Sequence, residues 1–294
     1  MRALTLCVSA ALLAFAGPVW SQVRFPENRP GGKLLLTGGV SALEGAGGGG
    51  LATWAVTSGY GAEDGLGGNL HATYVSLPDY ELRAYGAAFG FWDRVEVSYV
   101  RQEFDTGDAG AALGLGRGFT FGQDVYGVKV RLFGDAVYDA DSWLPQVAVG
   151  AQHKVADQGA VIGLVGGRDD EGTDYYVAAT KLFLAESLLV SGAVRFTNAN
   201  QTGLLGFGGD REAGRSAQFE GSVGYLLSPN WVIGAEYRSR PDNLGFAAED
   251  DAADVFVAWA PNKAVSVTAA YVDLGSVATF ADQRGLYLSL QVGF

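Results

Sequence analysis

The feature that most constrains the fold is an alternation of apolar and polar residues that recurs along almost the whole chain. In RVEVSYV (residues 94–100), two valines and a tyrosine occupy one face, while Glu96 and Ser98 occupy the other. The same alternation recurs in residues 124–134, 216–227 and 231–240. Successive side chains of a β-strand point to opposite faces, so this period of two predicts half-polar strands rather than helices.

About fourteen such strands are predicted, most of them near ten residues long, the length that a tilted strand needs to cross a bilayer. They lie at residues 33–43, 51–60, 66–77, 80–91, 94–104, 123–133, 144–155, 173–184, 187–198, 215–227, 231–240, 252–260, 264–274 and 284–294. Glycines blur the alternation in the first four, so twelve strands is the alternative. The sequence therefore predicts an all-β fold, a transmembrane antiparallel up-and-down β-barrel over residues 33–294.

The connections between these strands alternate in length. Residues 92–94, 185–187, 228–230 and 261–263 are tight turns, whereas residues 105–123, 156–172, 199–214 and 241–252 are long and often acidic. Short periplasmic turns and long outer loops are typical of outer-membrane barrels, and an even strand number places both termini in the periplasm. Four tryptophans stand beside the short turns, where an interfacial aromatic girdle belongs. They are Trp92, Trp143, Trp231 and Trp259.

The chain ends on a strand with an uninterrupted apolar face. Its apolar residues are Leu286, Leu288, Leu290, Val292 and Phe294. Such a stripe ending in an aromatic residue is similar to the C-terminal assembly signal of Gram-negative outer-membrane barrels. A chain can stop there if this strand pairs with the first one, because barrel closure satisfies its backbone.

The start of the chain predicts export. Arg2 precedes an apolar stretch from Ala3 to Ala16, and small residues offer a cleavage site after Ser21. We therefore expect a cleaved signal peptide at residues 1–21, a short periplasmic segment at 22–32, and the outer membrane of a Gram-negative bacterium as the destination. The only cysteine, Cys7, lies in the expected signal peptide. A mature chain without cysteine avoids wrong disulfides in an oxidising compartment.

Several longer blocks resemble a family of uncharacterised outer-membrane barrels, the domain of unknown function 3034. They are GGKLLLTGGVSALEGAGGGG (31–50), GAALGLGRGFTFGQDVYGVKVRLFGDAVYDADSWLPQVAVG (110–150), GTDYYVAATKLF (172–183) and GLLGFGGDR (203–211). The resemblance covers nearly the whole expected mature chain. It implies an envelope β-barrel and supplies no catalytic residues.

Charge and motifs limit the function classes. The formal net charge of −12 disfavours nucleic-acid binding, which needs a basic face. The glycine-rich runs at 45–50 and 112–118 lack the Gly-Lys-Ser/Thr ending of a phosphate loop. No catalytic, cofactor-binding or metal-binding residue is predicted. An outer-membrane hydrolase, the least favoured alternative, would need His71 or His153. The expected partners are membrane lipid, lipopolysaccharide and the barrel-assembly machinery, and the oligomeric state stays open.

The polar faces of the strands carry charges that must point inward, because a charge facing lipid at the bilayer centre costs about 2–4 kcal/mol. The predicted pore-lining residues are Arg83, Glu96, Lys129, Arg131, Lys181, Arg195, Glu220, Glu236 and Arg238, with Lys154 beside them. Hairpin register predicts Glu96 within two residues of the position opposite Arg131, and Glu220 diagonal to Arg195.

A barrel of twelve or more strands is too wide for its own side chains to fill. We expect the loop at 105–122 to fold into the lumen and narrow it, bringing Asp105, Asp108 or Arg117 opposite the basic wall residues. The function predicted first is a passive, porin-like channel for small hydrophilic solutes. The alternative is a non-conducting structural or interaction barrel.

Overall fold

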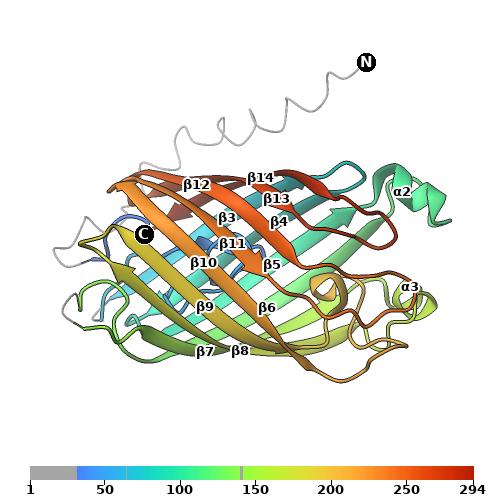
Figure 1. Ribbon diagram of the computed structural model, residues 1–294, viewed down its shortest axis with the longest axis horizontal. Helices are drawn as coiled ribbons and strands as arrows, with labels where there is room; N and C mark the ends of the chain where they lie inside the picture. The colour runs from blue at the N-terminus through green and yellow to red at the C-terminus, as the bar shows by residue number, and fades with distance from the viewer. Residues whose placement is uncertain (1–31, 64, 140–141) are drawn as a thin grey trace, which may run out of the picture. The chain divides into compact units, whose positions relative to one another are not determined.

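In a computed structural model, which describes residues 32–63, 65–139 and 142–294, twelve antiparallel strands close into one barrel (Figure 1). The strands are β3 (Leu66–Ser76), β4 (Glu81–Phe91), β5 (Val95–Asp105), β6 (Thr120–Phe133), β7 (Gln146–Ala156), β8 (Glu171–Phe183), β9 (Leu188–Thr197), β10 (Ser216–Ser228), β11 (Trp231–Arg238), β12 (Ala252–Asn262), β13 (Val265–Asp273) and β14 (Arg284–Gly293). Each strand pairs with its neighbours in sequence, which confirms the up-and-down topology. Among these residues no helix combines the length and apolarity that crossing a bilayer demands.

The alternation in the sequence becomes two faces of the wall. On β5, Val97 and Tyr99 are exposed on the outer surface, while Glu96, Val100 and Gln102 are buried inside. The outer face is thus an apolar band suited to lipid, and the polar residues turn inward, as half-polar strands predict.

The barrel closes where β14 pairs with β3, in register from Leu286 opposite Ser76 to Gly293 opposite Asn69. The backbone N–H of Phe294 donates to the carbonyl of Gly68 over 3.0 Å. The outward side chains of Leu286, Leu288 and Leu290 are 60, 49 and 45% exposed, so the C-terminal stripe faces lipid. Pairing with β3 therefore satisfies the backbone hydrogen-bonding groups of β14.

The strand number corrects one prediction. The wall holds twelve strands rather than about fourteen, because residues 33–43 and 51–60 are not part of it. Residues 33–60 contain only a small separate hairpin, β1 (Val40–Ser41) and β2 (Gly47–Gly48), and most of their residues are buried. The other twelve predicted strands are confirmed, each within about three residues at either end.

Most long connections lie at one end of the barrel and most tight turns at the other (Figure 1). The exceptions are the short β3–β4 turn (77–80), at the end with the long loops, and the longer β6–β7 connection (134–145), at the opposite end. The long, outer loops carry α2 (Gly107–Ala112), α3 (Gly159–Leu164) and the 3₁₀ turn η1 (Asn200–Gly203). The four predicted girdle tryptophans stand beside the connections at the other end, which we call the periplasmic end after the predicted orientation. Each is at least 39% exposed, and Trp231 stacks on Trp259 with ring centroids 5.6 Å apart.

Candidate functional site: a barrel lumen filled by the N-terminal segment

The lumen is occupied by residues 33–60, which we call the plug (Figure 1, blue). Its side chains are buried along nearly its whole length; Ser41, Ala55 and Thr57 have no exposed surface. The backbone N–H of Tyr60 donates to the carbonyl of Phe294 over 3.0 Å, and Lys33 pairs with Asp93 in the β4–β5 turn over 2.7 Å. Both ends of the plug therefore lie at the periplasmic end of the barrel.

Three glutamates of the wall accept hydrogen bonds from the plug backbone. Glu96 accepts from the N–H groups of Gly47 (3.1 Å) and Ser58 (2.7 Å). Glu220 accepts from Thr53 N–H and Glu236 from Leu51 N–H, each over 2.7 Å. An irregular segment in a lumen has backbone groups that need partners, and these carboxylates supply them.

Basic and amide side chains satisfy the plug carbonyls in the same way. Lys129 donates to the carbonyls of Gly47 and Val56, each over 2.8 Å. Gln102 and Gln146 donate to the carbonyls of Leu43 and Ala55 over the same distance. These polar wall side chains, which could line a water-filled pore, are therefore hydrogen-bonded to the backbone of the plug.

The plug also bonds across the seam between the first and last strands of the barrel. The N–H of Ser41 donates to the amide oxygen of Gln291 on β14 over 2.8 Å. Its hydroxyl lies 2.8 Å from the amide oxygen of Asn69 on β3. One plug residue thus joins the two strands that close the wall.

Glu44 places a plug carboxylate among three wall cations. Its carboxylate pairs with Lys154, with Arg238 over 2.6 Å and with Arg195 over 3.6 Å. The wall acids Asp174 and Glu220 complete the group: Asp174 lies 2.7 Å from Lys154, and Glu220 lies 2.5 Å from Arg195. We call these six residues the ion cluster. Three acids balance three bases, and every member is almost fully buried.

The glycine run at 45–50 is explained by close approach to these side chains. A Cβ on Gly49 would lie 1.7 Å from Oε1 of Glu236, and one on Gly47 would lie 2.9 Å from Oε2 of Glu96. Side chains at these positions would push the plug backbone out of reach of the carboxylates. The run is thus a docking surface rather than a phosphate loop.

The predicted register is confirmed, although the partner of Glu96 is Lys129 rather than Arg131, which pairs with Asp93. Glu96 lies opposite Lys129, two residues from Arg131, and its carboxylate is 3.1 Å from the Lys129 ammonium. Arg195 lies opposite Gln218, two residues from Glu220, so their ion pair is diagonal.

The pore-lining prediction is wrong for two residues, Arg83 and Lys181. Arg83 is on the outer face, where its exposed guanidinium pairs with Glu81 over 3.2 Å. Thr180, the residue before Lys181, points into the lumen and accepts a hydrogen bond from the plug. The side chain of Lys181 therefore points to the opposite face of β8, where its ammonium donates to loop carbonyls such as that of Asp139 over 2.8 Å. The β6–β7 connection covers it. Side chains still alternate around Arg83, but the apolar residues Leu82 and Ala84 point inward there and the charged ones outward. For Lys181, the sequence does not reveal the loop that covers it.

The other predicted lining residues, Glu96, Lys129, Arg131, Lys154, Arg195, Glu220, Glu236 and Arg238, do face the lumen. Arg131 lies at its periplasmic mouth, paired with Asp93, and its Nε donates to the carbonyl of Gly134 over 2.9 Å. Sequence reasoning missed Glu44 and Asp174. Glu44 lies in the connection between two segments predicted as wall strands, 33–43 and 51–60, where no inward-facing charge is expected.

The prediction for the loop at 105–122 is also wrong. Asp108 and Arg117 pair with each other over 2.6 Å outside the lumen, with side chains 80 and 78% exposed. The space expected for this loop is filled by the plug. Leu113 and Leu115, from the same loop, instead line an apolar cavity above it.

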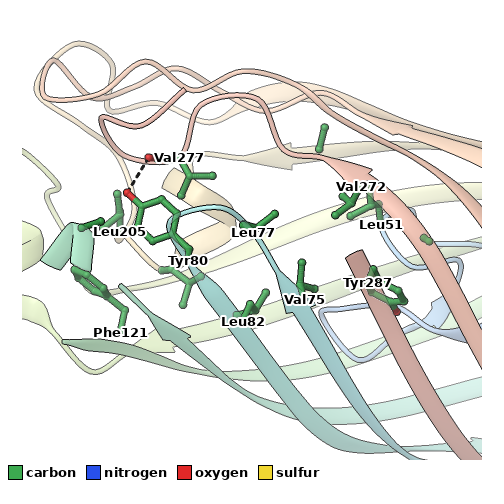
Figure 2. Packing of buried hydrophobic residues seen from close by; sticks show 14 of the residues in the cluster. Leu51, Val75, Leu77, Tyr80, Leu82, Phe121, Leu205, Val272, Val277 and Tyr287 are labelled. Carbon is green, nitrogen blue, oxygen red and sulfur yellow. Dashed lines mark hydrogen bonds between the residues drawn. The ribbon is translucent and has the colours of Figure 1, made fainter. Parts of the chain in front are cut away.

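This outer cavity, of about 210 Å³, lies between the plug and the outer loops. Leu43 and Leu51 line it from the plug, Leu82 and Phe121 from the wall, and Leu205 and Val277 from the loops. Figure 2 shows Leu82, Phe121, Leu205 and Val277 near Tyr80, whose hydroxyl donates to the carbonyl of Val277 over 3.2 Å.

Neither histidine forms a hydrogen bond with a serine among the described residues. His71 is buried on the lumen side of β3, and neither ring nitrogen has a hydrogen-bond partner among the described residues. His153 is exposed, and its Nδ1 lies 3.0 Å from the Thr173 hydroxyl. Within the described ranges, therefore, no serine–histidine hydrogen bond supports a hydrolase.

Comparison with known proteins gives a family and a fold. The family described as "Protein of unknown function (DUF3034)" matches residues 37–291. The structure of the KdgM porin is 9% identical, with a TM-score of 0.51 over 77% of this chain and 99% of that chain. The structure of the NanC porin is 11% identical, with a TM-score of 0.47 over 77% and 98%. At such identities the likeness shows the fold alone, an outer-membrane barrel. No curated protein matches the chain.

Proposed function

The chain belongs to the DUF3034 family, and we propose that it is an outer-membrane channel held closed at rest by its own plug. The observation that carries the proposal is the character of the contacts between plug and wall. Apolar contacts hold part of the plug, where Trp54 packs with Leu182 and Leu36 packs with Val232. Much of the rest is held by hydrogen bonds between the plug backbone and Glu96, Lys129, Glu220 and Glu236. A wall built of such groups is wettable, so withdrawal of the plug would leave a polar pore.

The position of the plug supports release toward the periplasm. Its two ends lie at the periplasmic mouth, and residues 61–65 connect it to the start of β3. The lumen side chains then exposed are of both signs, which suits small hydrophilic solutes rather than one ion species. The proposal therefore keeps the predicted solute class and replaces a permanently open pore with a gated one.

The proposal includes a location and partners. The barrel sits in the outer membrane of a Gram-negative bacterium, reached through export and signal-peptide cleavage. Its lipid-facing stripes contact membrane lipid and lipopolysaccharide, and the barrel-assembly machinery inserts it. No catalytic residue is assigned.

The decisive experiment compares single-channel conductance of the wild-type protein and the Glu44→Ala variant, each extracted from membranes and placed in a planar bilayer. Removing Glu44 leaves three buried cations facing two acids, which weakens plug seating. We expect a mostly silent wild type and frequent open steps from Glu44→Ala. Glu81→Ala, which removes an exposed acid of the outer face, serves as the matched control and should stay silent.

A disulfide lock makes the test specific to the plug. The Cβ of Ser98 on β5 lies 3.7 Å from the Cβ that a side chain at Gly45 would have, within the range of a disulfide. Because Gly45 has a φ of 89°, a side chain there strains the backbone, and the reduced form of the double variant is the control for that strain. Gly45→Cys and Ser98→Cys added to Glu44→Ala should abolish the open steps, and a reductant should restore them. If neither Glu44→Ala nor deletion of residues 33–60 conducts in a folded, heat-modifiable barrel, the channel proposal fails and the non-conducting barrel replaces it.

A further inference from the structure

The outer cavity differs in chemistry from the rest of the lumen. Loops at the water-exposed end of a barrel are ordinarily polar. Here Leu204, Leu205 and Val277 are at most 7% exposed and belong to one apolar cluster, in which Leu205 and Val277 lie near Tyr80 (Figure 2). The loops therefore build an apolar chamber between water and a polar lumen.

The polar side chains on the cavity lining are already bonded within the protein. Arg240 Nε donates to the carbonyl of Asp250 over 2.7 Å, and Thr106 donates to the carbonyl of Phe119 over the same distance. Glu44 and Arg238, at the floor, bond each other. A sugar or nucleotide needs many free donors and acceptors, so this lining disfavours such ligands.

The size of the cavity suits a small molecule. An apolar cavity of roughly 150 Å³ stays dry and takes up benzene, and the outer cavity is larger, at about 210 Å³. An empty apolar cavity is unfavourable because its lining lacks packing partners, and an apolar occupant restores them.

We propose that the outer cavity is a binding site for a small apolar molecule, of the size of one or two aromatic rings or a short alkyl chain. The occupant contacts Leu43 and Leu51, so it touches the plug directly. This inference goes beyond the proposed channel and does not depend on it, since the cavity exists with the plug in place.

The test uses 3-(trifluoromethyl)-3-phenyldiazirine, a small apolar aromatic that inserts into nearby C–H bonds when illuminated. The full protein in lipid nanodiscs is labelled over a range of concentrations, and labelled residues are located by mass spectrometry. We expect saturable labelling of Leu82, Leu205 or Val277 that excess toluene suppresses. Lipid-facing residues such as Leu288 should show labelling that rises linearly.

Two cavity-filling variants make the result specific. Leu205→Trp and Leu82→Trp should each reduce saturable labelling at least tenfold, whereas Leu288→Trp, on the lipid face, should not change it. Heat-modifiable migration checks that each barrel folds, and the second variant serves if the first does not. Labelling that never saturates, or saturable labelling that both folded variants retain, overturns the inference. Because no conductance is measured, this result stands apart from the test of the channel.

Discussion

Glu44 in the plug and Arg238 on β11 are separated by 194 residues in sequence, yet Nη1 of Arg238 donates a hydrogen bond to Oε2 of Glu44 over 2.6 Å. Lys154 and Arg195 approach the same carboxylate from β7 and β9. This one side chain therefore connects the plug to a wide arc of the wall.

Replacing Glu44 with glutamine should loosen the plug without unfolding the barrel. Removing one partner of a buried ion pair costs about 3–5 kcal/mol, which corresponds to more than a hundredfold in a docking equilibrium. Hydrogen exchange of plug amides, measured by mass spectrometry, should accelerate accordingly, while amides of β5 to β8 keep their protection. Glu81→Gln is the control, and equal exchange in both variants would contradict a role for Glu44 in holding the plug.

Gly49→Ala should be destabilising because the added Cβ would lie 1.7 Å from Glu236 Oε1. Overpacking of this kind typically costs about 1–3 kcal/mol. The matched control is Gly163→Ala in α3, where an added Cβ meets nothing within 4 Å and alanine favours the helix. Urea unfolding followed by electrophoretic mobility should show a lower midpoint for the first variant only; similar midpoints would mean that the plug backbone moves aside freely.

Glu249, in the β11–β12 loop, should make the outer loops less stable as pH rises. Burial raises the pKa of Glu249 to about 7, although Arg240 and the N–H of Gln201 oppose the shift. The folded state then binds its proton more tightly than the unfolded state, so stability falls between about pH 4.5 and 7. The full effect is of order 3 kcal/mol.

Glu249→Gln carries an amide in place of the protonated acid and should remove this dependence. Protection of residues 239–251 against exchange should match wild type near pH 4 and exceed it at pH 8. A variant less protected at pH 8 would show that the ionised carboxylate, paired with Arg240, stabilises the loop.

Ion selectivity of the opened channel should depend on Arg131 and not on Arg83. In the Glu44→Ala background, Arg131→Glu replaces a cation with an anion at the periplasmic mouth, so reversal potentials in a salt gradient should shift toward cation preference. Arg83→Glu changes charge equally but on the outer face, and should leave selectivity unchanged. Equal shifts from both would indicate a response to net charge rather than to a pore lining.

Much of the barrel is predictable from sequence because each wall strand carries its own signal. Val97 and Tyr99 alternate with Glu96 and Ser98 whatever the neighbouring strands do, and tilted strands of about ten residues recur with turns between them. The tryptophans at one end and the stripe ending in Phe294 fix the orientation in the same local way.

The plug escapes this reasoning because its signal is not local. Residues 33–43 and 51–60 are as apolar as wall strands, and their location depends on contacts such as Ser41 with Gln291, 250 residues away. Gly47 and Gly49 are the sequence features that relate to the location of the plug. They appear as flexible linker residues in sequence, and as close-approach positions once Glu96 and Glu236 stand beside them.

The two hydrogen bonds of Ser41, to Asn69 and Gln291, have a consequence for the order of assembly. Gln291 lies on β14, so the inner bonds across the seam are complete only when this strand has paired with β3. Seating of the plug at this point therefore follows or accompanies closure of the cylinder. An open sheet does not offer Ser41 both partners side by side; only the finished seam does.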